Sequence, residues 1–301
     1  MPEPKAASPS SSLHPSILGR LQRRTGSAVA RVVRLSGGSV HQAYRVWLGD
    51  DRSFFLKTSA HTSPRLFATE AEGLRWLAGF AALRTPAVLA VADQRSDESG
   101  FLALEWIPHT PPTDVGFARF GFKLAELHCH GQLSPGWQRA GFIGPLPQLN
   151  GGEALTWPEF WAERRIREML VHARKMLPDN VVQLVDLAAS HTDEIIGKGR
   201  PLAPLHGDLW HGNVIFHDDE PVLVDPAVYI GDPEVDLAML ALFGGMGPAF
   251  WRSYHTQLAV EPGFERRQAM YQLWPQLVHV AIFGGGYVSG VESCARRALA
   301  D

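Results

Sequence analysis

The chain has 301 residues, of which 45% are hydrophobic and 20% charged, and its formal net charge is −3. This balance indicates neither a nucleic-acid nor a membrane-surface partner, and the apolar content is enough for two lobes. Two cysteines, Cys129 and Cys294, are too few for a disulfide framework, and no apolar run is long enough to span a membrane. The first residues also lack the apolar segment of a signal peptide. We therefore expect a cytoplasmic protein; the oligomeric state does not follow from the sequence.

The beginning of the chain alternates short apolar runs with Gly or Asp turn signals, a pattern typical of a β-rich lobe. Residues 1–12, rich in Ser, Pro and Ala, are predicted to be a disordered tail. Helical spacing of apolar residues predicts helices over 14–24 and from Pro64 to Leu77. The predicted strands cover residues 30–35, 43–48, 53–57, 87–92 and 100–107.

A proline-rich break at 108–112 separates this lobe from a mostly helical remainder. We therefore predict an N-lobe over 13–107 and a C-lobe over 108–301. Two short predicted strands, 214–216 and 222–224, interrupt the helices of the C-lobe. The predicted helices cover residues 114–130, 157–176, 180–197, 234–243, 248–258 and 264–283.

The strongest chemical signal is the spacing of three polar residues in the C-lobe. Asp208 and Asn213 are five residues apart, and Asp225 follows at the end of the apolar run 221–224. Phosphoryl transfer needs a carboxylate that accepts and aims the attacking hydroxyl, and oxygen ligands that hold Mg²⁺. We therefore predict a kinase-type phosphotransferase with Asp208 as catalytic base and with Asn213 and Asp225 as metal ligands. Together with the two lobes, this predicts an α+β, bilobal protein-kinase-like fold.

The same loop has a competing interpretation as a transition-metal site formed by His206, Asp208 and His211. Their spacing of two and three residues does not match a common helical ligand pair, so we expect His206 to pack or hydrogen-bond within the loop. Asp236 starts the apolar run 237–242. We expect it to be a buried carboxylate at a helix start that holds backbone N–H groups.

A nucleotide-binding site is predicted in the N-lobe. Lys57 ends an apolar strand and is placed to reach phosphates, whereas the alternative is a lysine that extends along the surface. Glu70 borders the inward face of the next helix and is preferred to Glu72 as the partner of Lys57. A glycine-rich turn, which is also compatible with an ordinary hairpin, supplies three candidate phosphate-binding residues: Gly37, Gly38 and Ser39.

Aromatic residues of the C-lobe are candidates for acceptor binding. Trp210 lies two residues from Asp208, where its ring face suits stacking on a sugar. Trp274, His279 and Tyr287 lie on the last predicted helices and either line the same cleft or pack in the core.

The sequence resembles the fructosamine kinase (ketosamine-3-kinase) family, which is related to aminoglycoside phosphotransferases and choline kinases. The Leu-Trp pair after Asp208 and the block 242–245 separate this family from its wider relatives. The residues that carry the resemblance are 136–137, 143–144, 147–150, 157–165, 206–213, 225–239, 242–245, 271–273 and 283–287.

The resemblance implies ATP- and Mg²⁺-dependent phosphorylation of the sugar 3-hydroxyl of a ketosamine, such as a ribulosamine or fructosamine adduct. The phosphorylated adduct then falls apart, which reverses glycation. The resemblance also implies a phosphate-positioning pair, Lys57 and Glu70, and an adenine-facing hinge at 104–107, with Glu105, Trp106 and Ile107 as nucleotide-binding residues.

Five features depart from the family pattern. Ser39 stands where cysteine or aspartate is common, His41 stands near a common asparagine position, and His211 replaces a glycine. The pair 232–233 and the helical Pro275 also differ, and with His211 they bear on the acceptor pocket. The alternatives are therefore a kinase for another small acceptor, such as an aminoglycoside or a choline-like amine, and a nucleotide-binding pseudokinase.

Overall fold

The computed structural model describes residues 13–35, 41–59, 63, 65–94, 99–132, 134–151, 155–197 and 200–300. It divides into two compact units: unit 1 comprises Met1–Arg75 and Pro86–Ile107, and unit 2 comprises Trp76–Thr85 and Pro108–Asp301. Residues 76–85, which the sequence placed in the N-lobe, thus group with the helical unit. The predicted tail at 1–12 and the turn residues Gly37, Gly38 and Ser39 lie outside the described residues.

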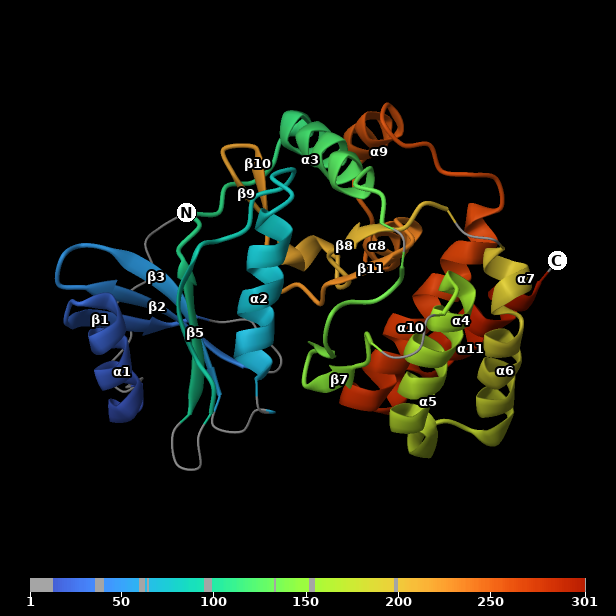
Figure 1. Ribbon diagram of the computed structural model, residues 1–301, viewed down its shortest axis with the longest axis horizontal. Helices are drawn as coiled ribbons and strands as arrows, with labels where there is room; N and C mark the ends of the chain where they lie inside the picture. The colour runs from blue at the N-terminus through green and yellow to red at the C-terminus, as the bar shows by residue number, and fades with distance from the viewer. Residues whose placement is uncertain are drawn as a thin grey trace. The chain divides into compact units, whose positions relative to one another are not determined.

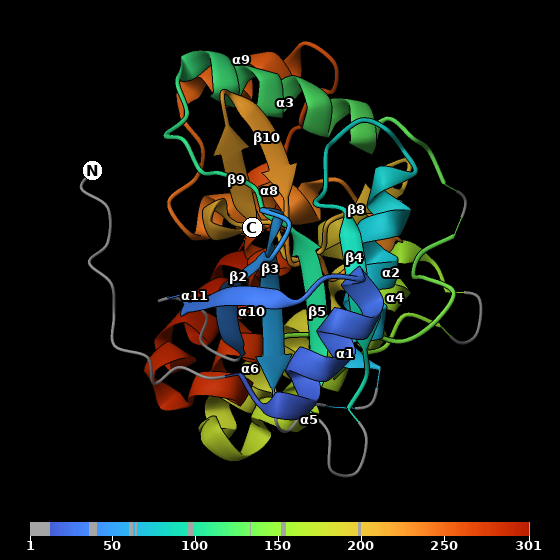
Figure 2. The same ribbon diagram turned by 90° about the vertical axis from the view of Figure 1, so that its left-hand side faces the viewer.

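Unit 1 is built on one antiparallel sheet with the strand order β1-β2-β3-β5-β4 (Figure 1). Helix α1 (Pro15–Thr25) lies across one face of this sheet (Figure 2). Its Ile17 and Leu21 are buried against Val46 and Leu56. Because side chains alternate along a strand, Lys57 projects from the opposite face. The strands are β1 (Val29–Arg34), β2 (Gln42–Leu48), β3 (Ser53–Ser59), β4 (Val88–Ala92) and β5 (Gly100–Glu105).

Helix α2 (Leu66–Ala78) follows β3 and crosses the division between the units within its last turn. Its predicted apolar face is confirmed, because Phe67, Ala71 and Leu74 are all buried. The carboxylate of Asp93 accepts a hydrogen bond from the backbone N–H of Ala68 in the first turn at 3.3 Å. This contact supplies an acceptor for one of the N–H groups that a helix start leaves open.

Unit 2 is mainly helical, with α3 against α9 and α10 against α8 and α11 (Figure 1). The predicted helix 157–176 is continuous but includes a π-helical stretch at Ala162–Arg167. The predicted helix 180–197 divides at His191, and the C-terminal α11 was not predicted. The α-helices are α3 (Asp114–His128), α4 (Trp157–Trp161), α5 (Glu168–Ala173), α6 (Asp179–Ser190), α7 (Thr192–Ile196), α8 (Glu234–Leu242), α9 (Pro248–His255), α10 (Phe264–Phe283) and α11 (Val288–Leu299).

Three short strand pairs complete unit 2. They are β6 (Gly141–Ile143) with β7 (Leu146–Gln148), β8 (Ala203–Leu205) with β11 (Tyr229–Gly231), and β9 (Val214–His217) with β10 (Glu220–Leu223).

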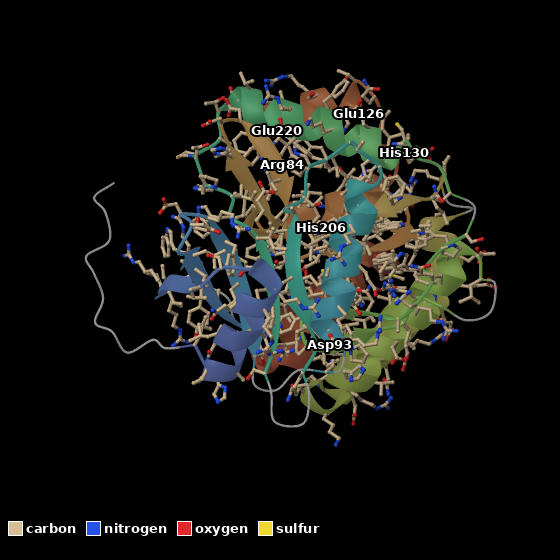
Figure 3. All side chains as sticks on the ribbon, turned by 60° about the vertical axis from the view of Figure 1, so that its left-hand side comes forward. Arg84, Asp93, Glu126, His130, His206 and Glu220 are labelled. Carbon is tan, nitrogen blue, oxygen red and sulfur yellow. The ribbon has the colours of Figure 1, made fainter. Side chains whose placement is uncertain are left out.

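The β9–β10 hairpin is held by contacts of its turn and of β10 with α3 and with Arg84. The Asp219 carboxylate accepts hydrogen bonds from the backbone N–H and hydroxyl of Thr113, each at 2.8 Å, just before α3 begins. Glu220 pairs with Lys123 on α3, and the N–H of Leu223 donates to the carbonyl of Arg84 at 2.8 Å (Figure 3). These contacts position the segments on either side of the hairpin, which carry Asn213 and Asp225.

Candidate active site

Lys57 and Glu70 form a buried ion pair in unit 1. The Nζ of Lys57 lies 2.9 Å from Oε1 of Glu70, and the two side chains are only 9% and 12% exposed. Glu72 instead pairs with Arg65 nearer the surface, at 3.0 Å. The pairing predicted from the facing of α2 is therefore confirmed. Since an ammonium group is costly to bury alone, Glu70 fixes Lys57 in place.

Removing the Glu70 charge is expected to weaken nucleotide use. Glu70→Gln removes the carboxylate charge that lies 2.9 Å from the buried Lys57 ammonium, so kcat/KM for ATP should fall by at least about tenfold. The matched variant Glu72→Gln removes the charge that pairs with Arg65 at a partly exposed position and should change kcat/KM little. Steady-state kinetics with varied ATP would check both, and equal losses in the two variants would contradict the distinction.

The three predicted hinge residues lie at the end of β5 in unit 1, with Glu105 as its last residue. Glu105 exchanges hydrogen bonds with Ala87, its N–H donating at 2.8 Å and its Oε2 accepting at 3.2 Å. Trp106 lies under the guanidinium of Arg45, with 4.1 Å between the Arg45 Cζ and the ring centroid. The Glu105 N–H therefore already has a partner within unit 1.

Asp208 and Asn213 are joined directly in the catalytic loop of unit 2, here defined as residues 205–213. The Asn213 Nδ2 donates to the Asp208 carbonyl at 2.8 Å and to its Oδ2 at 3.2 Å. Both hydrogen bonds use the amide nitrogen, so the amide oxygen of Asn213 is left for another ligand. The buried Leu209 anchors the loop between these residues.

Asp225 is placed beside the loop by backbone contacts. The N–H of Val224, at the end of β10, donates to the carbonyl of Asn213 at 3.0 Å. Asp225 has a φ of 57°, a left-handed conformation that is uncommon outside glycine. The structure therefore brings Asp208, Asn213 and Asp225 together as the sequence spacing predicted. A carboxylate and an amide oxygen suit Mg²⁺, which takes oxygen ligands and completes its shell with phosphates and water.

His206 connects the loop to the strand before Asp225. Its Nε2 lies 2.9 Å from the Val224 carbonyl, and its Nδ1 accepts from the Asp208 N–H at 3.3 Å. Because a carbonyl only accepts, Nε2 carries the proton and the ring is neutral. Burial lowers the pKa of the His206 imidazole. Both nitrogens are occupied within the protein, which confirms the hydrogen-bonding role and removes His206 from any transition-metal site.

His206 is expected to make the fold sensitive to acid. The imidazole has a pKa of about 6.5 in an unfolded chain. The pKa of the same ring is lower in the folded protein. The stabilisation that the neutral ring gives the fold is therefore complete above the unfolded pKa and is lost as the pH falls through the folded pKa. The free energy of unfolding then falls by up to about 1.4 kcal/mol per pH unit. Urea unfolding at about pH 7.5 and 5.5 should show a smaller stability difference for His206→Gln than for wild type. An identical pH dependence would contradict this assignment.

Asp236 holds the catalytic loop from within unit 2. Its carboxylate is 0% exposed and accepts from the backbone N–H groups of His206 at 2.9 Å and Gly207 at 3.0 Å. His128, which also contacts the hydroxyl of Tyr254, lies 3.3 Å from the same carboxylate. The expected burial and N–H binding are confirmed, but the N–H groups belong to the loop rather than to the start of α8. Sequence spacing gave no sign of this partner.

Gly207 is the point of closest backbone packing in the loop. It has a φ of 79°, and a Cβ at this position would lie 2.1 Å from the Ala227 carbonyl oxygen. No larger residue fits without moving one of these segments.

Three of the predicted acceptor residues form ring contacts around the loop. Trp210 lies against His211, with ring centroids 5.0 Å apart, and against Phe243 at 5.8 Å. His211 is exposed, and its Nδ1 lies 2.9 Å from the Phe243 carbonyl. His279 continues the contacts from Phe243 at 5.4 Å. All three therefore belong to one surface that begins in the catalytic loop.

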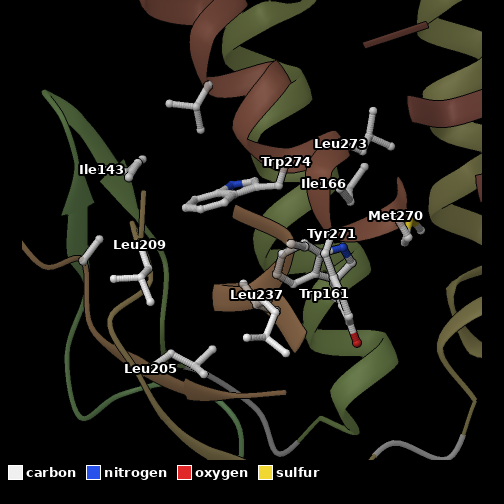
Figure 4. Close-up of a cluster of buried hydrophobic side chains, with 14 of the residues drawn as sticks. Ile143, Trp161, Ile166, Leu205, Leu209, Leu237, Met270, Tyr271, Leu273 and Trp274 are labelled. Carbon is white, nitrogen blue, oxygen red and sulfur yellow. The ribbon is translucent and has the colours of Figure 1, made fainter. Parts of the chain in front are cut away.

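Trp274 is a correction to the predicted acceptor set. Its side chain is 1% exposed and packs in the core of unit 2 beside Trp161 and above Leu209 (Figure 4). The guanidinium of Arg165 also lies 5.5 Å from its ring centroid. A side chain enclosed in this way belongs to the buried cluster that also holds Leu209, and it does not present a face to an acceptor.

The departures at 232–233 and Pro275 are also structural. Asp232 is fully buried, pairs with Arg200 at 2.6 Å and accepts the Tyr271 hydroxyl at 2.8 Å. Pro275 is buried within α10. Of these three departures, only His211 lies at the surface that begins in the catalytic loop.

Sequence reasoning missed a buried polar support beneath the loop. Arg165, from the π-helical stretch, is 0% exposed and donates to the Leu149 carbonyl and the Asn150 side chain, both at 2.7 Å. Gln148 donates to the same Asn150 oxygen at 3.3 Å and to the Ala227 carbonyl at 3.1 Å. These residues lie in segments 147–150 and 157–165, so the resemblance was the only sequence signal for them.

Comparisons with known proteins agree with this geometry. A sequence model of the fructosamine kinase family matches residues 14–301. A probable ketoamine kinase of Synechocystis is 35% identical over 271 residues, covering 88% of this chain and 89% of its own. The chloroplastic protein-ribulosamine 3-kinase of Arabidopsis thaliana is 31% identical over 278 residues, covering 88% and 81%.

Solved structures show the same fold. One from Thermobifida fusca, described as a fructosamine-3-kinase, has a TM-score of 0.83 and 38% identity and covers 94% of this chain and 98% of its own. An aminoglycoside phosphotransferase has a TM-score of 0.62 at 17% identity, covering 95% and 100%. The chain therefore has the bilobal protein-kinase-like fold. Within the described residues, no helix is long and apolar enough to cross a membrane.

Proposed function

Because this chain belongs to the fructosamine kinase family, we propose that it phosphorylates the 3-hydroxyl of ketosamines, such as ribulosamine and fructosamine adducts, with ATP and Mg²⁺. It is an ATP-dependent phosphotransferase that acts on an alcohol group. The observation that carries the proposal is the match to the family across residues 14–301, together with the joined Asp208 and Asn213.

Asp208 is the proposed catalytic base. Its carboxylate accepts the proton of the sugar hydroxyl and aims the hydroxyl oxygen for attack. The Asn213 amide and the His206 ring hold Asp208 through three hydrogen bonds, of 2.8, 3.2 and 3.3 Å, so little reorganisation is needed when the acceptor binds.

The polar atoms present also fit the nucleotide and metal that the family implies. We propose that the amide oxygen of Asn213 and the carboxylate of Asp225 hold Mg²⁺ and that Lys57, fixed by Glu70, binds phosphate oxygens. When bound, ATP supplies the phosphoryl group and Mg²⁺ offsets its negative charge. Trp106 and Ile107 are the proposed adenine contacts, and Trp210 is the proposed contact for the sugar.

We also propose that the enzyme serves deglycation, because a 3-phosphorylated ketosamine is prone to lose its amine. Cys129 and Cys294 are both free thiols, which suits a reducing compartment such as the cytoplasm.

An acceptor panel tests the proposal. ATP consumption with Mg²⁺ would be measured on ribulosyl-lysine, fructosyl-lysine, free fructose, an aminoglycoside and choline. Turnover on the two ketosamines well above the other acceptors is expected. Turnover on another acceptor alone would move the enzyme to a different substrate class, and nucleotide binding without any turnover would indicate a pseudokinase.

A further inference from the structure

A continuous series of ring contacts starts in the catalytic loop and ends at the surface of unit 2. Beyond Trp210 and Phe243, His279 contacts Phe283 at a centroid distance of 5.6 Å and Tyr287 at 4.8 Å. Phe283 and Tyr287 also contact each other at 6.1 Å. The rings of this aromatic run belong to Trp210, His211, Phe243, His279, Phe283 and Tyr287.

The outer end of the aromatic run is exposed and apolar. Phe283 is 48% exposed and Tyr287 37% exposed, which is high for large rings. The His279 ring is held against its own helix, α10, because its Nδ1 donates to the Pro275 carbonyl at 2.6 Å. Among the described residues, no cation–π contact involves Phe283 or Tyr287. A ligand group that meets this end therefore finds exposed ring surface.

The proposed reaction places one part of the substrate along this surface. In a ketosamine, the carbonyl carbon and one methylene separate the amine nitrogen from the carbon that carries the 3-hydroxyl. When that hydroxyl meets Asp208 and the sugar meets Trp210, the nitrogen and its substituent lie just beyond the sugar. The aromatic run leads outward from Trp210, so it offers this substituent a continuous apolar support.

We infer that Phe283 and Tyr287 form a subsite for an apolar or aromatic substituent on the amine nitrogen of the ketosamine. The inference rests on the proposed function and adds a substrate class to it. The enzyme then distinguishes ketosamines by their amine as well as by their sugar.

Two fructose adducts that differ only in the amine substituent test the subsite. The kcat/KM of the benzylamine adduct is expected to exceed that of the methylamine adduct by about tenfold, which corresponds to burying roughly 60 Å² of apolar surface. In the double variant Phe283→Ala with Tyr287→Ala, this preference should fall to near unity. Phe122→Ala removes a ring on α3 that is similarly exposed, at 39%, and should leave both the preference and the basal activity unchanged.

The possible failures are distinguishable. If the wild type phosphorylates both adducts without a preference, the subsite is wrong and the proposed function stands. The same conclusion follows if the preference survives in the double variant. Wild type that phosphorylates neither adduct would overturn the proposed function and the subsite together. Circular dichroism of the double variant confirms that any lost preference is not a loss of folding.

Discussion

Asp208→Asn is expected to lower kcat by about 10²–10⁴-fold, the usual contribution of a positioned general base. The amide of asparagine cannot accept the hydroxyl proton. Because asparagine and aspartate side chains are nearly equal in size, the packing contacts of the loop should remain. The Asn213 Nδ2 would retain the Asp208 carbonyl as an acceptor at 2.8 Å, so the loop itself should stay in place. Binding of ATP should therefore change little, and the loss should appear in turnover.

The control is another aspartate of unit 2. Asp218 is exposed in the turn between β9 and β10, with a φ of 49° that asparagine also tolerates. Asp218→Asn should keep full turnover. Steady-state kinetics and calorimetric ATP binding on the three proteins would check this, and an Asp208→Asn enzyme with wild-type kcat would remove Asp208 from the mechanism.

The second large effect is expected at Asp236, which touches no substrate in this account. Asp236→Asn retains one acceptor oxygen and places an NH₂ group against a buried N–H donor of the loop. We expect the free energy of unfolding to fall by about 2–5 kcal/mol, because a charged acceptor is lost and an N–H is left unpaired. Turnover should fall by about 100-fold, since a small displacement of Asp208 disturbs its aim at the hydroxyl.

Asp186→Asn provides the matched control, because this aspartate is exposed on α6 of the same unit. Its substitution should change stability by no more than about 0.5 kcal/mol. Urea unfolding and kcat would be measured together. A stable Asp236→Asn protein with normal turnover would show that the loop does not depend on this carboxylate.

The grouping of the candidate catalytic residues was predictable because their spacing is typical of one reaction class. The Asp208, Asn213 and Asp225 pattern needs no knowledge of the rest of the fold, and helical geometry alone separates Glu70 from Glu72. Most element positions in unit 1 also followed from apolar periodicity, as with the buried face of α2.

The remaining contacts were not predictable because they depend on tertiary packing. From the sequence, Trp274 could line the cleft or pack in the core. Only its observed packing beside Trp161 decides for the core. The partner of Asp236 lies 29 and 30 residues away, at Gly207 and His206. Helix α11 is a missed signal rather than an unpredictable one, because Val291, Cys294 and Ala298 already show helical spacing.

The most direct test of the account is release of the amine from a fructosyl-amine by the enzyme with ATP and Mg²⁺. Phosphorylation of the 3-hydroxyl turns it into a leaving group, so after ADP has formed, the wild-type product should break down to inorganic phosphate and free amine, and the Asp208→Asn reaction should release neither. Consumption of ATP with a phosphorylated adduct that stays intact on prolonged incubation would place the phosphate on another hydroxyl. That result would contradict the proposed 3-kinase activity.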